Sequence, residues 1–239
     1  MANGLPVRSP NDPAQYDDLT DEWWKPHGRF AALHWLAEAR GALVPPPPYP
    51  GAPLLDVACG AGLLAPHLPP GWRHVGLDLS ALSLVQARAH GVGPVRGDAL
   101  RLPFADASLP CVVAGEVLEH LPDLEGACAE LARVLAGGGV LVVDTLADTL
   151  FARLALLGVA EHVPGGPPAG LHRADLLVDP GRLTRALAAH GVHVRQLGGL
   201  RPSVPGYLLW LLRRRSSVRM LPTRSTAGVY QLIAVKEDT

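Results

Sequence analysis

Short apolar segments alternate with amphipathic ones from residue 54 onward, and a glycine-rich turn follows the first of them. Residues 54–58 are predicted to form a buried strand, and Gly60-Ala61-Gly62 follows directly. Further strands are predicted at 73–77, 92–96, 111–114, 140–144, 192–197 and 229–235, with helices at 80–89, 124–135 and 181–190. This alternation predicts an α/β fold, with a doubly wound, mostly parallel, seven-stranded sheet and helices on both faces.

The chain before and within this pattern suggests how it is divided. Residues 1–50 are expected to be an N-terminal extension, with a helix over 28–43 and a stiff proline-rich linker at 45–48. Residues 51–239 are expected to form the α/β domain. Residues 146–178 interrupt the alternation, so they are predicted to be an insertion.

Composition excludes several classes of protein. The 21 basic and 22 acidic residues argue against a strongly basic nucleic-acid binder. The three cysteines form no C-x-x-C pair, which argues against a disulfide scaffold or a zinc finger and favours a reducing, cytoplasmic compartment. No secretory signal and no apolar run of about 20 residues is visible, so no membrane-spanning helix is expected.

The glycine turn predicts a nucleotide-containing cofactor. Gly60 and Gly62 let the backbone approach a ligand closely, and a short helix predicted after them would offer free N–H groups to an anion. Asp78 follows at the end of the second predicted strand, where a carboxylate can accept both ribose hydroxyls. These features fit a nicotinamide dinucleotide and S-adenosylmethionine equally.

Three further features favour S-adenosylmethionine. Asp56, inside the first strand, can meet an ammonium group, which this cofactor carries and the nicotinamide dinucleotides lack. Asp98 follows the third strand, where it can accept from an adenine amine, and residues 115–123 after the fourth strand read Gly-Glu-Val-Leu-Glu-His-Leu-Pro-Asp. Together with the glycine turn, residues 53–145 resemble a class I S-adenosylmethionine-dependent methyltransferase. The resemblance implies a Rossmann-like fold.

The N-terminal extension narrows the resemblance. Trp23-Trp24, then Gly28, Phe30 and Leu33-His34, is similar to the start of the ubiquinone-biosynthesis O-methyltransferases of the 3-demethylubiquinol 3-O-methyltransferase type. By this resemblance Arg40 holds the cofactor carboxylate, since a guanidinium suits a planar anion. Ala58 and Gly115 approach the cofactor by their backbones. The chain departs from the family at Ala58 and Ala61, where glycine is common, and at Gly115, where the family carries a larger residue.

A second group of residues suggests a metal ion. Glu116, Glu119 and His120 are spaced i, i+3, i+4, on one face of a helical turn. By resemblance to the quinone methyltransferases, these three side chains would bind a divalent ion such as Mg²⁺ and lower the pKa of a catechol hydroxyl. In the other interpretation, the glutamate lines the cofactor pocket and the histidine caps a turn without any metal.

The insertion at 146–178 resembles the lid segment of that family, which covers the substrate and touches lipid. Its apolar positions 150, 151, 154 and 157 form one helical face, as in either a membrane-facing helix or an ordinary core helix. His172 matches a Gly-x-His of the family and is a candidate general base, or else a surface histidine. Residues 200–202 and 207–215 form an amphipathic stretch that ends in three arginines, so they would dock peripherally on an anionic membrane or wall the substrate pocket.

The predicted function is O-methylation of a phenolic or catechol small molecule, with a polyprenylated quinone precursor as one acceptor. Methyl transfer from a sulfonium depends mainly on orientation, which agrees with the lack of a nucleophile–base triad in the sequence. Tailoring of a secondary metabolite is the alternative within this class. A nicotinamide-dependent oxidoreductase is the alternative from another class, opposed by Asp56 and by the segment at 116–120. No nucleic-acid partner is expected.

Overall fold

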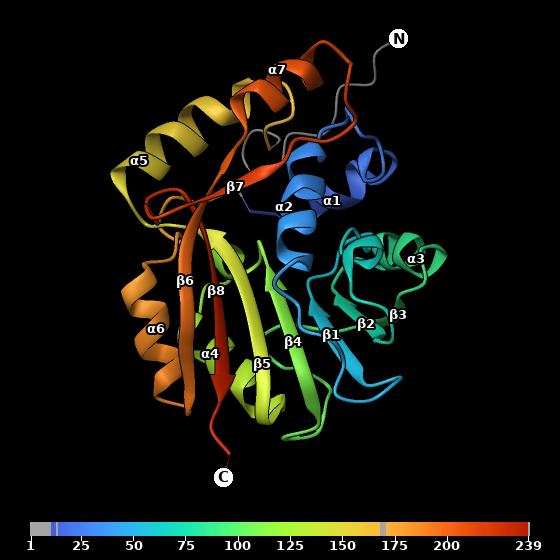
Figure 1. Ribbon diagram of the computed structural model, residues 1–239, viewed down its shortest axis with the longest axis vertical. Helices are drawn as coiled ribbons and strands as arrows, with labels where there is room; N and C mark the ends of the chain where they lie inside the picture. Colours follow the sequence, from blue (N-terminus) through green and yellow to red (C-terminus); the bar gives the residue numbers. More distant parts are fainter. Residues whose placement is uncertain (1–10, 13, 168–170, 239) are drawn as a thin grey trace.

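One mixed sheet organises the chain in the computed structural model, which describes residues 11–12, 14–167 and 171–238 (Figure 1). The eight strands lie in the order β3 (Gly93–Arg96), β2 (Arg73–Asp78), β1 (Pro53–Val57), β4 (Leu109–Gly115), β5 (Leu135–Leu146), β8 (Val229–Lys236), β6 (Val192–Pro202) and β7 (Met220–Thr223). The seven predicted strands are all present. The eighth, β7, was not predicted; it adds a short antiparallel edge to β6.

The pairing places a crevice at the carboxyl ends of the central strands. Strands β1 to β5 are mutually parallel where they pair, and β8 runs antiparallel to both β5 and β6. Since β1 pairs with β2 on one side and β4 on the other, the strand order reverses there. Ligands of open α/β sheets bind at the carboxyl ends of the strands beside such a reversal.

The chain just after the glycine turn of β1 differs from the prediction. Ala58, Gly60 and Gly62 have φ of +57°, +52° and +82°, so the turn itself bends through left-handed conformations. Beyond it, the short helix predicted here is only a three-residue 3₁₀ helix, η2 (Ala65–His67). Pro69 and Pro70 come next, and residues without an N–H group cannot extend a helix. No helix N-terminus therefore stands at this turn to bind an anion.

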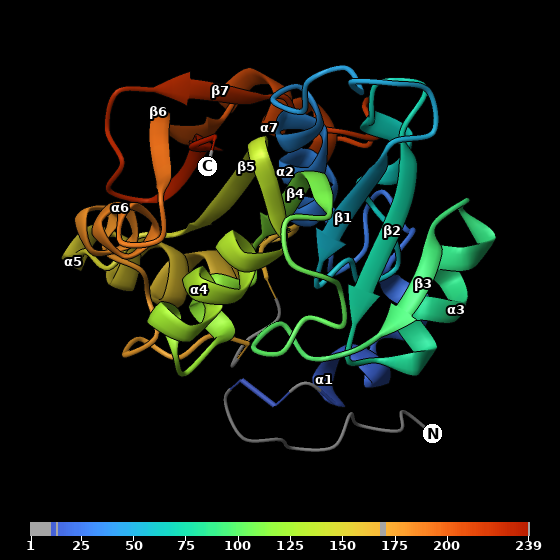
Figure 2. The same cartoon turned by 90° about the horizontal axis from the view of Figure 1, so that it is seen from below.

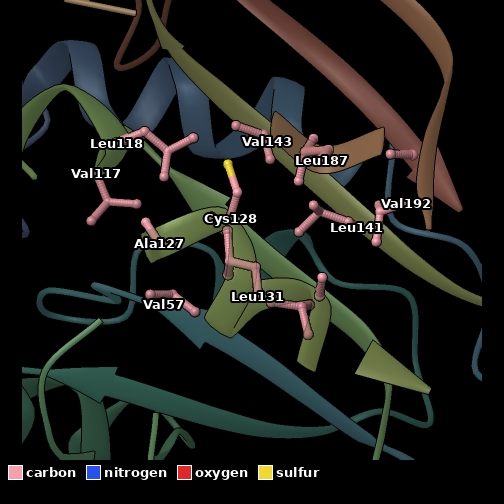
Figure 3. Close-up of a cluster of buried hydrophobic side chains, with 14 of the residues drawn as sticks. Val57, Val117, Leu118, Ala127, Cys128, Leu131, Leu141, Val143, Leu187 and Val192 are labelled. Carbon is pink, nitrogen blue, oxygen red and sulfur yellow. The ribbon is translucent and has the colours of Figure 1, made fainter. Parts of the chain in front are cut away.

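Helices cover both faces of the sheet (Figure 2). They are α2 (Ala31–Gly41), α3 (Ala81–Ala89), α4 (Leu124–Val134) and α6 (Pro180–Ala188). Alternate residues of β4 point to opposite faces, because successive side chains of a strand do so. Val112 packs in the cluster that contains Leu131 of α4 and Leu187 of α6 (Figure 3), whereas Val113 packs with Val44, just after α2.

The N-terminal extension and the insertion meet at the carboxyl end of the sheet, the upper end in Figure 1. The extension supplies α1 (Ala14–Asp18), η1 (Thr20–Glu22) and α2; the insertion supplies α5 (Leu150–Ala152), the π-helix η4 (Arg153–Val159) and η5 (Ala160–His162). A last helix, α7 (Val204–Leu211), packs on α2 through Trp210 and Trp35, whose ring centroids are 5.1 Å apart. Within the described part of the chain, no helix is long and apolar enough to cross a membrane.

Candidate cofactor and acceptor site

A cavity of about 660 Å³ lies at the carboxyl end of the parallel strands, and its size is typical of small-molecule sites. It collects most of the residues that the sequence predicted for the site. They are Arg40, Asp56, Ala58, Gly60, Asp78, Asp98, Gly115, Glu116, His120 and His172. Gly62 and Glu119, also predicted, do not line it. The predicted residues thus converge on one cavity although they come from segments far apart in the chain.

Asp78 is held rigidly at one end of the cavity. Its Oδ2 accepts a hydrogen bond of 2.8 Å from the N–H of Gly60, and its Oδ1 accepts one of 2.8 Å from the N–H of Ser80. Burial raises the pKa of this carboxyl, although the two N–H donors act in the opposite direction. Each oxygen keeps a lone pair for a further donor, so the carboxylate can receive two vicinal hydroxyls.

Glycine is required in the turn for close packing by protein groups. A Cβ at Gly60 would stand 2.6 Å from the ring of Trp23, and one at Gly62 would stand 2.9 Å from Val92. Gly62 therefore brings the turn against its neighbours behind the cavity and does not itself face a ligand. Only Gly60 combines this packing with a place in the cavity wall.

An aromatic stack that the sequence analysis missed forms another wall. The rings of Trp23 and Phe30 are 4.2 Å apart, and the ring of Tyr16 stacks 5.8 Å from Trp23. All three side chains line the cavity. The hydroxyl of Ser80, which caps α3, also bonds the carboxylate of Asp17, so the N-terminal extension is tied to the end of β2.

Four titratable side chains, Glu116, Glu119, His120 and His172, gather at or behind another part of the cavity wall. Glu119 is fully buried, and its Oε2 accepts a hydrogen bond of 2.6 Å from the hydroxyl of Thr145. The rings of His120 and His172 stack with centroids 5.0 Å apart. Nδ1 of His172 is buried without a hydrogen-bond partner among the described residues. The carboxyls of Glu116 and Glu119 form a side-chain hydrogen bond with each other, which needs a proton on Glu116. The unpartnered imidazole nitrogen indicates that a polar ligand belongs there.

Burial sets the charges of this cluster. It raises the pKa of Glu119 to about 7, and together with the Glu119 carboxylate it raises that of Glu116 well above its usual range. Burial also lowers the pKa of His120 to about 3 and that of His172 to about 4. Both imidazoles are therefore neutral at pH 7, and the two glutamates share less than two full negative charges.

Two residues of the N-terminal extension, Asn11 and Tyr16, form hydrogen bonds with His120. The ring Nδ1 lies 2.5 Å from Oδ1 of Asn11, and the ring Nε2 lies 3.3 Å from the hydroxyl of Tyr16. Nδ2 of Asn11 also donates to the backbone carbonyl of His120 at 2.9 Å. Burial raises the pKa of Tyr16, so its hydroxyl remains protonated and donates to Nε2. His120 is thereby held as the Nδ1–H tautomer.

Arg40, predicted to hold the cofactor carboxylate, lies in the cavity wall and pairs with Asp144. Asp144 was not among the predicted residues, although it lies near the end of β5, at the same edge of the sheet as Asp56 and Asp78. Asp56 in turn lies 3.2 Å from Nε2 of His74. A carboxylate at the end of a buried strand was the signal that could have revealed Asp144.

The insertion and α7 present apolar side chains to solvent. Leu150, Phe151 and Leu154 are 72%, 60% and 64% exposed, so this segment is not a core helix. The side chain of Leu157, predicted on the same face, lies outside the described residues. Further along the insertion, Leu156 and Leu171 line the cavity, and so does Pro202 of β6. The interpretation of 200–202 and 207–215 as a pocket wall is therefore confirmed at Pro202 and wrong for 207–215, none of whose residues lines the cavity.

Comparison with known proteins decides the family. A family model described as a methyltransferase domain matches residues 55–143. The ubiquinone biosynthesis O-methyltransferase of Chelativorans sp. (strain BNC1) is 32% identical over 207 residues, 78% of this chain and 81% of that protein. The chain belongs to the ubiquinone biosynthesis O-methyltransferase family. The enzyme of that name from Xylella fastidiosa (strain 9a5c), 32% identical over 210 residues, covers 84% of the chain with 83% of its own length.

Membership of this family identifies an S-adenosylmethionine-dependent O-methyltransferase and excludes the nicotinamide oxidoreductase. Solved structures agree on the fold. A possible histamine N-methyltransferase from Thermotoga maritima has a TM-score of 0.64 at 20% identity, covering 93% of this chain and 97% of its own. The [4+2]-cyclase SpnF has a TM-score of 0.61 at 19% identity, covering 99% of both chains. Because a cyclase shares this fold, the fold alone does not identify the substrate. The methyl acceptor must be inferred from the residues that line the cavity of this enzyme.

Proposed function

We propose that the enzyme methylates a phenolic hydroxyl of an apolar acceptor, such as the catechol of a polyprenylated quinone precursor. The observation that carries this proposal is the continuity of one cavity. The carboxylate of Asp78, the imidazoles of His120 and His172, and the apolar side chains of Leu156 and Leu171 all line it. A single cavity with both polar and apolar lining suits a ring that bears hydroxyls and an apolar tail.

The cofactor lies, in this proposal, along the ends of β1, β2 and β4. Asp78 accepts the ribose hydroxyls, and Asp98, whose Oδ1 receives the N–H of Leu100 at 2.9 Å, faces the adenine. The backbones of Ala58, Gly60 and Gly115 pass beside it. Asp56 faces the ammonium group, and Arg40 faces the carboxylate. S-adenosylmethionine would supply a sulfonium methyl group for in-line transfer to the acceptor oxygen, with breakage of the S–CH3 bond and departure of neutral S-adenosylhomocysteine.

The residues at the acceptor end orient the hydroxyl and receive its proton. Nδ1 of His172 is neutral and unpartnered, so it can accept a hydrogen bond from the acceptor. With a pKa near 4, His172 orients the hydroxyl better than it deprotonates it. Burial raises the pKa of Glu119 to about 7, within the range in which a general base works at neutral pH. We therefore propose that the Glu116–Glu119 pair accepts the proton of the acceptor hydroxyl.

A divalent ion fits the same end of the cavity. Glu119, His120 and His172 offer ligand atoms within 4.8 Å of one another, whereas Glu116, predicted as a ligand, is not in this group. Nδ1 of His172 is buried and unpartnered, Glu119 would exchange its bond to Glu116, and His120 would exchange its bond to Tyr16. Two neutral imidazoles and one carboxylate suit Zn²⁺ better than the predicted Mg²⁺, which prefers oxygen ligands. A bound Zn²⁺ would lower the pKa of a coordinated hydroxyl.

Exposed apolar side chains near the cavity suggest that the acceptor is taken from a membrane. Leu150, Phe151 and Leu154 of the insertion, and Leu208 and Leu212 of the α7 region, are all more than half exposed. Figure 1 shows α5 and α7 at the end of the molecule where the cavity lies. Exposed arginines 213–215 follow α7. We propose that this end docks peripherally on an anionic membrane, with the insertion as a lid over the acceptor.

Calorimetric titration with S-adenosylhomocysteine tests the cofactor part of the proposal. We expect micromolar binding, and at least tenfold weaker binding by Asp78→Ala, because two ribose hydrogen bonds to a charged group are lost. Asp175→Ala is the matched control, since Asp175 pairs with Arg173 at the surface, away from the cavity. Unchanged affinity in Asp78→Ala would remove the ribose assignment.

The acceptor is tested separately by methyl transfer to a panel of catechols with and without prenyl tails. We expect transfer to tailed catechols in the presence of anionic vesicles. Preferred transfer to a small, untailed phenol would favour the tailoring of a secondary metabolite.

A further inference from the structure

A buried ion pair lies behind the wall of the cavity where the cofactor carboxylate is expected. Nε of Arg40 lies 3.0 and 2.9 Å from Oδ1 and Oδ2 of Asp144, and Nη2 lies 2.7 Å from Oδ1. Asp144 is fully buried and Arg40 is 7% exposed. Nη1 has no hydrogen-bond partner in the described part of the chain. One edge of the guanidinium is thus occupied, and one nitrogen remains for a ligand.

The carboxylate of Asp144 is the fixed member of this pair. Asp144 stands in β5, in register with Gly115 of β4 and Gln231 of β8. Its Oδ1 accepts from the N–H of Glu116 at 3.1 Å, and its Oδ2 accepts from Nε2 of Gln231 at 3.2 Å. Two donor groups outside the ion pair therefore hold the carboxylate in place, and the long side chain of Arg40 comes to it from α2.

Gly115 makes the pairing possible. A Cβ at this position would stand 1.9 Å from Cζ and 2.1 Å from Nε of Arg40. The guanidinium therefore occupies the space that any other side chain at 115 would fill. Arg40, Gly115 and Asp144 form one unit, in which the glycine admits the arginine and the aspartate holds it.

We propose that Asp144 is a positioning residue that fixes Arg40 at the cofactor site and weakens its attraction for the cofactor carboxylate. This inference rests on the proposed placement of the cofactor. A buried guanidinium without a counter-ion binds a carboxylate strongly, because the interior screens charge poorly. Asp144 already neutralises this charge and would repel a second carboxylate on the far side of Arg40. The amino-acid end of the cofactor, which substrate and product share, is thereby held moderately, and product can leave.

The test compares two ligands that differ only in the amino-acid end. S-adenosylhomocysteine carries the carboxylate, whereas 5′-methylthioadenosine has the same adenosine and thioether without it. Asp144→Asn keeps the shape and removes the charge. We expect it to bind S-adenosylhomocysteine about tenfold more tightly than the wild type, to bind methylthioadenosine within about twofold, and to have a lower Tm without ligand. A merely structural role for Asp144 would weaken both ligands together.

A second variant and a wild-type measurement guard against failure of Asp144→Asn to fold. Asp144→Ser is smaller, keeps an acceptor for the N–H of Glu116, and should shift the two affinities in the same way. In the wild type, we expect S-adenosylhomocysteine to bind less than about a hundredfold more tightly than methylthioadenosine. A thousandfold wild-type preference, or an unchanged or reduced preference in the variants, would overturn this inference alone. Binding of neither ligand by the wild type would overturn the proposed function as well.

Discussion

The alanine at position 58 gives a stability prediction with an internal control. Ala58 has φ of +57°, the left-handed region, which costs a residue with a Cβ about 1–2 kcal/mol. Ala58→Gly removes this cost but adds about 0.5–1 kcal/mol of chain entropy to the unfolded state. The side chain is only half-buried, so little packing is lost. We expect a net stabilisation of about 0.5–1 kcal/mol, or about 1–4 °C in Tm for a chain of this size.

Ala61, in the same turn, is the matched control. It is fully buried and is not among the described residues with positive φ, so glycine relieves nothing there. Ala61→Gly loses a buried methyl and gains unfolded-state entropy, and we expect a destabilisation of about 1–2 kcal/mol. Urea and thermal unfolding without cofactor measure both variants. If Ala58→Gly is destabilised as much as Ala61→Gly, the conformational argument is refuted.

The site and the surface give three further predictions. We expect Mn²⁺ to bind the wild type and to bind Glu119→Gln at least tenfold more weakly, as calorimetry would show; equal binding would end the ion proposal. Leu154→Asp should reduce sedimentation with phosphatidylglycerol vesicles about tenfold, whereas Val85→Asp, at a 69% exposed site on α3, should not. Because folding raises the pKa of Glu119 from 4.5 to about 7, the folded chain binds this proton more tightly, and the carboxyl costs stability as pH rises through that interval. Glu119→Gln should therefore gain stability relative to the wild type between pH 4.5 and 7 in urea unfolding with chelator, and a constant difference would contradict the shift.

The sequence predicted the sheet well because its strands are apolar and separated by clear breaks. It missed β7, whose four residues include Pro222; such a short strand, with a residue that cannot donate, is tolerated at a sheet edge and carries almost no pattern. It also predicted a short helix after Gly62, where Pro66, Pro69 and Pro70 limit the chain to the three-residue 3₁₀ helix η2.

The candidate site was predictable where topology alone places residues together. Asp56, Asp78 and Gly115 stand at or near the ends of neighbouring strands, so any parallel sheet of this order brings them to one edge. The contact of Tyr16 with His120 spans 104 residues and depends on how the N-terminal extension folds back. No local pattern encodes such a contact. For the same reason, the sequence placed Glu116 in the candidate metal group, whereas the structure places His172 there.

The place of β8 has a consequence for synthesis of the protein. β5 and β6 are made before β8, yet β8 lies between them and is the strand to which both bond. While the chain is still on the ribosome and Val229–Lys236 have not emerged, β5 and β6 each carry an open edge of unpaired N–H and C=O groups. Such edges are templates for aggregation. Because β5 is made before β6, its edge stays open longer than that of β6, and a chain interrupted before Val229 would leave both edges unpaired.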